Sequence, residues 1–149
     1  MISVDLIPYK SKLRLKKTEE KTYVFDFIRG KWLVLLPEEL VRQLLILYLI
    51  EEKSYSKNSI AIERGIKVNN LSKRCDILLF DKNTQPLMLV ECKAPKVKIT
   101  QDVFRQIAIY NMSFEVDYLL VTNGIQTYCC KMDYIKKSWE FLNDIPVAK

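Results

Sequence analysis

The spacing of apolar residues changes along the chain, and each change predicts a different element. Short runs rich in aromatic and β-branched residues predict strands or extended segments at 23–36, 60–68, 75–80, 87–93, 117–122 and 125–131. Longer apolar stretches predict helices at about 37–53, 101–114 and 133–142. Thr100 can cap the second helix, and Asn123-Gly124 predicts a hairpin turn between the last two strands.

The first predicted helix opens with Pro37, Glu38 and Glu39, which suit the first turn of a helix. It is apolar on nearly every face, so we expect it to be deeply packed. From this helix onwards, the order of the elements is helix, three strands, helix and strand.

Three charged residues interrupt two of the strand-like runs: Asp76, Glu91 and Lys93. The runs are Cys75-Asp-Ile-Leu-Leu-Phe80 and Leu87-Met-Leu-Val-Glu-Cys-Lys93, joined by the turn-rich segment 81–86. Because side chains alternate along a strand, Glu91 and Lys93 share one face. Burying a charge is costly unless it is paired or bound to a metal. The pattern therefore predicts a metal-dependent site, and points towards phosphodiester hydrolysis.

The length of the joining segment predicts how the two strands pair. A hairpin centred between Asn83 and Thr84 places Asp76 directly opposite Glu91, with Cβ atoms about 4.5–5.5 Å apart. Two carboxylates at that distance repel each other unless a cation lies between them, and Mg²⁺ suits such oxygen ligands. The same register places Cys75 opposite Cys92 on the other face, where two reduced thiols are favoured over a disulfide.

The charged residues also match a known motif. Asp76, fourteen intervening residues and Glu91-Cys92-Lys93 resemble the Asp…Glu-x-Lys motif of the PD-(D/E)xK nuclease superfamily. The longer strings Lys73-Arg-Cys-Asp-Ile-Leu-Leu-Phe-Asp81 and Leu89-Val-Glu-Cys-Lys-Ala-Pro95 are similar to the N-terminal nuclease domain of type I restriction enzyme R subunits, in its short, separately encoded form. Further matching segments lie at 25–32, 37–43, 106–110 and 120–124. Cys75 stands where the motif name has proline.

The resemblance implies a fold and an activity. The fold is of the α/β (α+β) class, with a restriction-endonuclease-like αβββαβ core and a central mixed sheet flanked by helices. The activity is that of a Mg²⁺-dependent DNA endonuclease, with Mn²⁺ able to substitute, in restriction or DNA processing. Asp76, Glu91 and the backbone carbonyl of Cys92 would bind the metal, while Lys93 would orient the attacking water.

Three residues have both a functional and a structural interpretation. Glu39 corresponds to an acid that joins the metal site in many relatives, or else it complements the helix dipole. Glu63 is an alternative third carboxylate, or else a residue on a solvated strand edge. Arg42 would contact a carboxylate or a DNA phosphate, or else lie on the helix surface.

The second predicted helix and its surroundings carry further candidates for DNA contact. Gln106 and Tyr110 lie four residues apart and share a helix face. The resemblance implies that such a pair supports metal-bound water or a phosphate, while the alternative is a tyrosine packed in the core. Lys96, Lys98 and the basic stretch within 10–21 would contact the DNA backbone, or else be solvated charges.

Length and charge agree with these expectations. We predict one nuclease-like domain over residues 1–149, with 1–21 as a basic, partly irregular N-terminal extension and 22–149 as the core. The 149 residues are 49% apolar, enough for one good core. The formal charge of +6 and the pI of about 9.1 favour a polyanionic partner such as DNA.

Several function classes are excluded or disfavoured by the sequence. The absence of histidine excludes a histidine base or metal ligand. Four cysteines without a C-x-x-C pair disfavour zinc and a secreted disulfide scaffold. No secretory signal is seen, and the most apolar stretch, 44–50, is too short to cross a bilayer, so we expect a cytoplasmic protein with no membrane partner.

The sequence also bears on partners. No Gly-rich phosphate loop, helix-turn-helix or zinc finger is recognisable, so a separate motor or specificity partner is expected to select the DNA. A homodimer would explain cleavage of both strands. Two other interpretations stay open: a catalytically inactive nucleic-acid-binding or scaffold module with the same fold, and a charged hairpin in an unrelated interaction protein.

Overall fold

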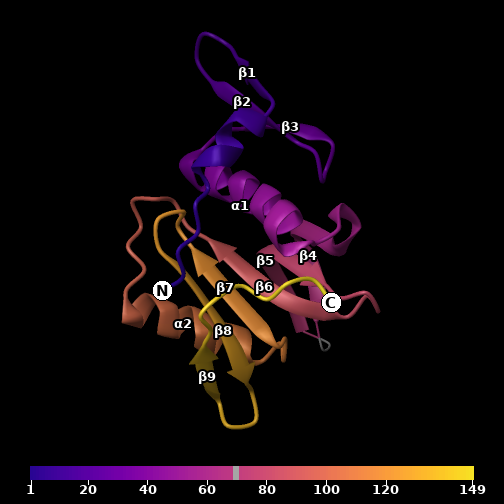
Figure 1. Ribbon diagram of the computed structural model, residues 1–149, viewed down its shortest axis with the longest axis vertical. Coiled ribbons are helices and arrows are strands. Elements are labelled where there is room, and N and C mark those ends of the chain that lie inside the picture. The colour runs from indigo at the N-terminus through magenta and orange to yellow at the C-terminus, as the bar shows by residue number, and fades with distance from the viewer. Residues whose placement is uncertain (69–70) are drawn as a thin grey trace.

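A six-stranded mixed sheet forms the centre of the molecule, with one long helix on each face (Figure 1). The computed structural model describes residues 1–68 and 71–149, and the side chains of these except 63–68 and 71–74. Helix α1 spans Pro37–Lys53 and α2 spans Gln101–Met112. The sheet contains, in order, β4 (Ile60–Val68), β5 (Leu71–Phe80), β6 (Pro86–Cys92), β7 (Tyr118–Thr122), β8 (Thr127–Asp133) and β9 (Ser138–Phe141).

The connectivity of this sheet is that of an αβββαβ core. Strands β6 and β7 are parallel, because α2 connects them across one face, and the other neighbouring strands are antiparallel. Helix α1 and strand β4 have the predicted bounds, and the Thr100 hydroxyl caps α2 by accepting a hydrogen bond from Val103 N at 3.1 Å. The predicted mixed sheet flanked by helices is therefore confirmed.

The helix predicted at 133–142 is wrong. This segment is a turn followed by strand β9, which pairs with β8 at the edge of the sheet. Lys137 has a φ of 54°, a left-handed conformation that no helix continues through. Trp139 and Phe141 lie two residues apart and share one face of the strand. Both rings contact Phe104 of α2, with centroids 6.2 and 5.0 Å from that of Phe104. Aromatic packing against α2 outweighs the local helix pattern.

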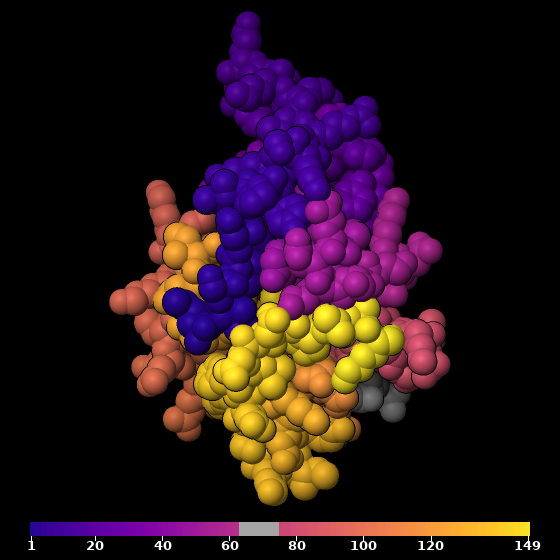
Figure 2. Space-filling view, in the orientation of Figure 1, coloured from indigo at the N-terminus to yellow at the C-terminus, as the bar shows by residue number. Residues whose placement is uncertain are grey.

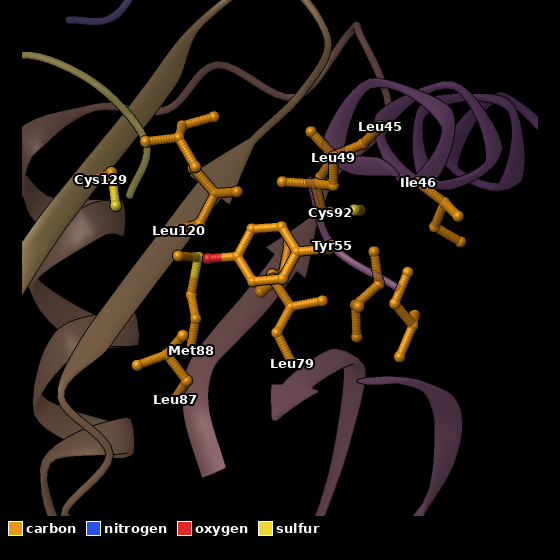
Figure 3. Packing of buried hydrophobic residues seen from close by; sticks show 14 of the residues in the cluster. Leu45, Ile46, Leu49, Tyr55, Leu79, Leu87, Met88, Cys92, Leu120 and Cys129 are labelled. Carbon is orange, nitrogen blue, oxygen red and sulfur yellow. The ribbon is translucent and has the colours of Figure 1, made fainter. Parts of the chain in front are cut away.

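Helix α1 is packed against the sheet through a continuous apolar cluster (Figure 3). Leu45, Ile46 and Leu49 of the helix contribute to it, and each leucine contributes about 1.5–3 kcal/mol by full burial. Tyr55, just beyond the helix, lies among these side chains, and its hydroxyl donates a hydrogen bond to Pro146 O at 2.8 Å. This cluster fixes the position of α1 over the strands that carry the charged residues.

The first residues of the chain belong to the fold. Ile2 is buried and donates its backbone N–H to Thr127 O at 2.8 Å. The 3₁₀ segment η1 (Ile7–Lys12) follows, and Leu6 and Tyr9 pack against Leu44 of α1. Strand β1 (Leu15–Lys17) then pairs with β2 (Thr22–Asp26), which pairs with β3 (Lys31–Val34). These apolar residues complete the covering of α1, and the predicted division at residue 21 stays a prediction.

The end of α1 is held to the C-terminal segment by an ion pair. Lys53 Nζ, which is almost fully buried, lies 2.8 Å from Asp144 Oδ2. A second 3₁₀ segment, η2 (Lys57–Ser59), follows the helix. The hydrogen bond from Lys53 lowers the pKa of the Asp144 carboxyl below its usual value.

Among the described residues, no helix combines the length and apolar character needed to cross a bilayer.

We expect Asp144→Asn to lower the free energy of unfolding by about 1 kcal/mol near neutral pH, between the values for exposed and buried pairs. Because the folded-state pKa of Asp144 is lowered, its contribution is complete above the unfolded aspartate pKa and is lost as pH falls through the folded value. Urea denaturation at several pH values should therefore show the difference between wild type and variant shrinking in acid. Glu140→Gln, an exposed acid on β9, serves as the control; an equal loss in that variant would contradict the assignment.

Candidate active site

The β5–β6 hairpin carries Asp76 on one strand and Glu91 on the other. Ile77 pairs with Val90, as expected for a hairpin centred between Asn83 and Thr84, and the register shifts only at Phe80, towards the turn. The observed register therefore agrees with the predicted centre as far as Ile77 and Val90, and the direct pairing of Asp76 with Glu91 stays a prediction.

Asp76 reaches across the hairpin to the strand that carries Glu91. Its Oδ2 accepts a hydrogen bond from Cys92 N at 2.7 Å, and its Oδ1 lies 3.4 Å from Arg42 Nη2. The side chain is half-buried, so the contact with the backbone of β6 is partly shielded from water. This hydrogen bond ties the Asp76 carboxylate to the Glu91-Cys92-Lys93 segment.

The strand is irregular at Asp76 itself. Cys75 and Ile77 are two residues apart, yet Cys75 packs in the cluster beneath α2 and Ile77 in the cluster beneath α1. Cys92 lies in the α1 cluster, so the predicted facing of Cys75 and Cys92 is wrong, because alternation of faces fails between Cys75 and Ile77. All four cysteines are buried, and none of them is in a disulfide in the described structure. Burial raises the pKa of the Cys92 thiol well above its usual value, and the nearby Asp76 charge raises it further.

Parallel pairing with β7 positions Glu91 and Lys93. Glu91 pairs with Val121, and Lys93 N donates to Thr122 O at 2.8 Å just beyond the end of β6. Cys92 between them is fully buried under α1, whereas Glu91 and Lys93 are half-buried. This difference in burial agrees with Glu91 lying on the side of the strand opposite Cys92, and the shared face of Glu91 and Lys93 stays a prediction.

The segment after Lys93 is held by the turn between β7 and β8. Asn123 Nδ2 donates to Val97 O at 2.8 Å, and Gln126 Oε1 accepts from Ile99 N at 3.0 Å. Gly124 in the same turn has a φ of +87°, and a Cβ there would lie 3.3 Å from Val41 of α1. The sequence interpretation treated Asn123-Gly124 only as a hairpin turn and missed its role in holding the segment that follows Lys93.

A network of ion pairs connects α1 to Asp76. Arg42 is nearly fully buried, with Nη1 2.6 Å from Glu39 Oε1 and Nη2 3.4 Å from Asp76 Oδ1. Gln43 Nε2 donates to the other Glu39 oxygen at 3.0 Å. Arg42 therefore contacts carboxylates, the first of its two functional alternatives, and its burial does not suit contact with a DNA phosphate. The Arg42 guanidinium therefore bridges Glu39 and Asp76.

The same network extends to the turn between β2 and β3. Asp26 is fully buried, and Arg29 Nε lies 2.7 Å from its Oδ2. Arg29 Nη2 also lies 3.8 Å from Glu39 Oε1. The sequence interpretation assigned no role to Asp26 or Arg29; their spacing of three residues and the match at 25–32 were the available signals.

The remaining candidates lie on exposed parts of the chain. Gln106 and Tyr110 are both exposed on α2, and the Tyr110 ring is 61% exposed and contacts Phe114 with centroids 6.1 Å apart. Tyr110 therefore does not pack in the core, and the predicted role of the pair in holding water or a phosphate stays a prediction. Lys96 and Lys98 are exposed in the segment after Lys93.

The described side chains do not add a third carboxylate to the candidate metal site of Asp76 and Glu91. Among them, no group of three histidine, cysteine, aspartate or glutamate residues is arranged to hold a metal. Glu63 lies in β4 between Ile62, which pairs with Ile77 of β5, and Arg64, which pairs with Cys75. The Glu63 backbone is therefore next to Asp76, but its side chain is outside the described part of the structure. The described site consists of two carboxylates, a lysine and the buried Arg42.

The fold has a counterpart among solved structures. A fragment assigned to an HsdR subunit of a type I restriction enzyme from Vibrio vulnificus YJ016 aligns with a TM-score of 0.52 and 19% sequence identity. The alignment covers 75% of this chain but only 24% of that one, so this chain spans about a quarter of the length of the solved fragment. At this identity the likeness shows the fold alone, an α+β core that this chain shares with the solved fragment.

The family is shown by the sequence itself. The sequence model described as type I restriction enzyme R protein N terminus matches residues 37–146, from the start of α1 to beyond β9. The chain therefore belongs to this family. No curated protein matches it significantly.

Proposed function

We propose that the protein is a Mg²⁺-dependent DNA endonuclease that hydrolyses phosphodiester bonds with Asp76, Glu91 and Lys93. One observation carries the proposal: the hairpin register and the hydrogen bond from Cys92 N to Asp76 bring a carboxylate of β5 to the strand segment bearing Glu91 and Lys93. Membership of the R-protein N-terminal family supports a nuclease-related role.

The donor set suits a hard divalent cation. Asp76, Glu91 and the backbone carbonyl of Cys92 offer only oxygen atoms, which Mg²⁺ prefers and Mn²⁺ also accepts. Asp76 Oδ2 is fixed by the backbone of β6, while Oδ1 has a longer, 3.4 Å contact with Arg42. A cation can therefore compete with the Arg42 guanidinium at Oδ1. When bound, Mg²⁺ supplies positive charge that activates water and stabilises charge on the phosphate.

The chain's own residues then orient the reactants. The Lys93 ammonium positions the attacking water and stabilises the negative charge that develops on the phosphate. Gln106 and Tyr110 hold the phosphate or its water from the exposed face of α2, and Lys96 and Lys98 contact the DNA backbone. These roles rest on the family resemblance and on exposure.

A third carboxylate has two sources. Glu39 reaches the metal only if its oxygens leave Arg42 and Gln43, which now hold both of them. Glu63, on the strand beside Asp76, is the alternative.

The partners are proposed on the same basis. DNA is the substrate, and a separate motor or specificity partner selects it; membership of the R-protein N-terminal family supports both. A homodimer would cut both strands. Four buried cysteines that are not joined in disulfides suit the reducing cytoplasm, where we place the protein.

A catalytically inactive DNA-binding or scaffold module is the second candidate, and one observation favours it. Arg42 contacts both Asp76 and Glu39 from within the protein, so Asp76 has a cationic partner even without a metal. In that case neither folding nor DNA binding would depend on Mg²⁺, and Glu91→Ala would leave both unchanged.

The experiment incubates the purified chain with supercoiled, linear and single-stranded DNA in Mg²⁺, in Mn²⁺ and in a chelator. The endonuclease proposal expects cutting in either metal and none in the chelator. DNA that is bound equally in all three conditions and cut in none would contradict it and favour the scaffold.

A further inference from the structure

The small sheet of β1, β2 and β3 projects beyond α1 at one end of the molecule (Figures 1 and 2). Its strands are antiparallel, and their register pairs Lys16 with Tyr23 and Phe25 with Trp32. Side chains alternate along strands, so these four residues share one face, together with Arg14, whose backbone oxygen accepts from Phe25 N. We call Arg14, Lys16, Tyr23, Phe25 and Trp32 the aromatic–basic face.

Cations and rings alternate across this face. The Arg14 guanidinium lies 5.0 Å from the Phe25 ring centroid and 5.3 Å from that of Trp32. Lys16 Nζ lies 4.6 Å from the Trp32 centroid and 5.6 Å from that of Tyr23. Phe25 and Trp32 meet edge to face, with centroids 5.3 Å apart.

The two faces of the small sheet differ in environment. Val24 and Asp26 on the opposite face are fully buried. On the aromatic–basic face the three rings are only half-buried, and Arg14 and Lys16 are exposed. Cation–π contacts at exposed sites contribute only about 0.5–1 kcal/mol each, so they account weakly for three large rings kept partly in water. Such a face is typical of a binding surface.

We propose that the aromatic–basic face binds single-stranded DNA, with bases stacked on Trp32 and its neighbouring rings and phosphates paired with Arg14 and Lys16. Unpaired bases offer their π-faces for stacking, and the two cations complement the charge of the backbone. A duplex hides those base faces and offers the sheet only its phosphates. The inference deepens the proposed nuclease function by naming the form of DNA that the protein holds near its site.

The face is fixed relative to the candidate active site. The turn between β2 and β3 carries Arg29, which bridges Asp26 of the small sheet and Glu39 of α1. Glu39 is in turn connected through Arg42 to Asp76. A strand held on the aromatic–basic face is therefore presented in a constant orientation to Asp76.

The test measures fluorescence anisotropy of a labelled oligothymidylate of about 20 nucleotides, a length on the scale of known single-strand sites. The full chain is used in a chelator, so that hydrolysis does not occur. We expect Trp32→Leu to weaken binding about tenfold, since stacking contributes about 1–3 kcal/mol per base. Lys16→Gln should weaken it several-fold, whereas Lys17→Gln, an equal charge change on the opposite face of the same strand, should not.

A second readout guards against misfolding of the Trp32 variant. The chain has two tryptophans, so Trp139→Phe leaves Trp32 as the single tryptophan. Its fluorescence is excited at wavelengths where the tyrosines absorb little. Its emission should be quenched by the oligonucleotide and much less by a matched duplex. Unchanged Trp32 emission, or equal losses of DNA affinity in Lys16→Gln and Lys17→Gln, would overturn the inference and point to a protein partner on this face. Quenching of Trp32 emission without cleavage in Mg²⁺ would contradict only the nuclease proposal. Cleavage without quenching would contradict only the proposal that the aromatic–basic face binds single-stranded DNA.

Discussion

Replacement of Lys93 by alanine is expected to lower the rate of DNA cleavage by a factor on the order of 10²–10³, the usual effect of removing one group that stabilises transition-state charge. Lys93 is half-buried at the end of β6, and its backbone is held by Thr122. Its loss removes the positive charge that the account assigns to the phosphate. The fold should persist, because the parallel pairing of β6 with β7 uses the backbone only.

The measurement is the single-turnover cleavage rate in Mg²⁺, with circular dichroism and DNA affinity recorded on the same samples. Lys131→Ala, which removes an exposed lysine from β8, is the matched control and should cut like wild type. Cleavage by Lys93→Ala at the wild-type rate would show that the lysine is assigned wrongly.

Replacement of Arg42 by methionine should have the largest effect on stability. We expect a loss of about 3–5 kcal/mol in a chelator, because Glu39 and Asp76 would keep their charges in a largely buried setting without the cation between them. Mg²⁺ should restore part of this loss if Asp76 belongs to a metal site, since a divalent cation would replace the guanidinium charge.

Urea denaturation of wild type and Arg42→Met, each with and without Mg²⁺, measures both effects. Adding Glu39→Gln to Arg42→Met should recover stability, since it removes one of the two carboxylates that lost the Arg42 contact. If Arg42→Met is as stable as wild type in the chelator, the ion-pair network has no structural role. If Mg²⁺ fails to shift its unfolding, Asp76 does not hold the metal in this variant.

The register of the charged hairpin was predictable because it depends on local features. The symmetric joining segment sets Ile77 against Val90, next to the predicted pair of Asp76 and Glu91. The bounds of α1 were likewise predictable from Pro37 and from the continuous apolar pattern that follows. In each case the information lies within a few consecutive residues.

The ion-pair network and the edge strand depend on contacts between distant segments. Arg42 contacts Asp76 across 34 positions of sequence, and no local pattern indicates which carboxylate a helix arginine will meet. Strand β9 forms because Trp139 and Phe141 meet Phe104 of α2. Asn123 likewise holds Val97, 26 residues away, while its local signal is only that of a turn.

The central claim is that Asp76 and Glu91 support metal-dependent hydrolysis of DNA. The most direct test is nicking of supercoiled plasmid in Mg²⁺ by wild type and by Glu91→Gln, purified in parallel, with Glu115→Gln as an exposed control. We expect wild type and Glu115→Gln to nick the plasmid, and a chelator to stop this nicking. A folded Glu91→Gln should not nick the plasmid. Equal nicking by wild type and Glu91→Gln, or no nicking by wild type that binds the plasmid, would contradict it.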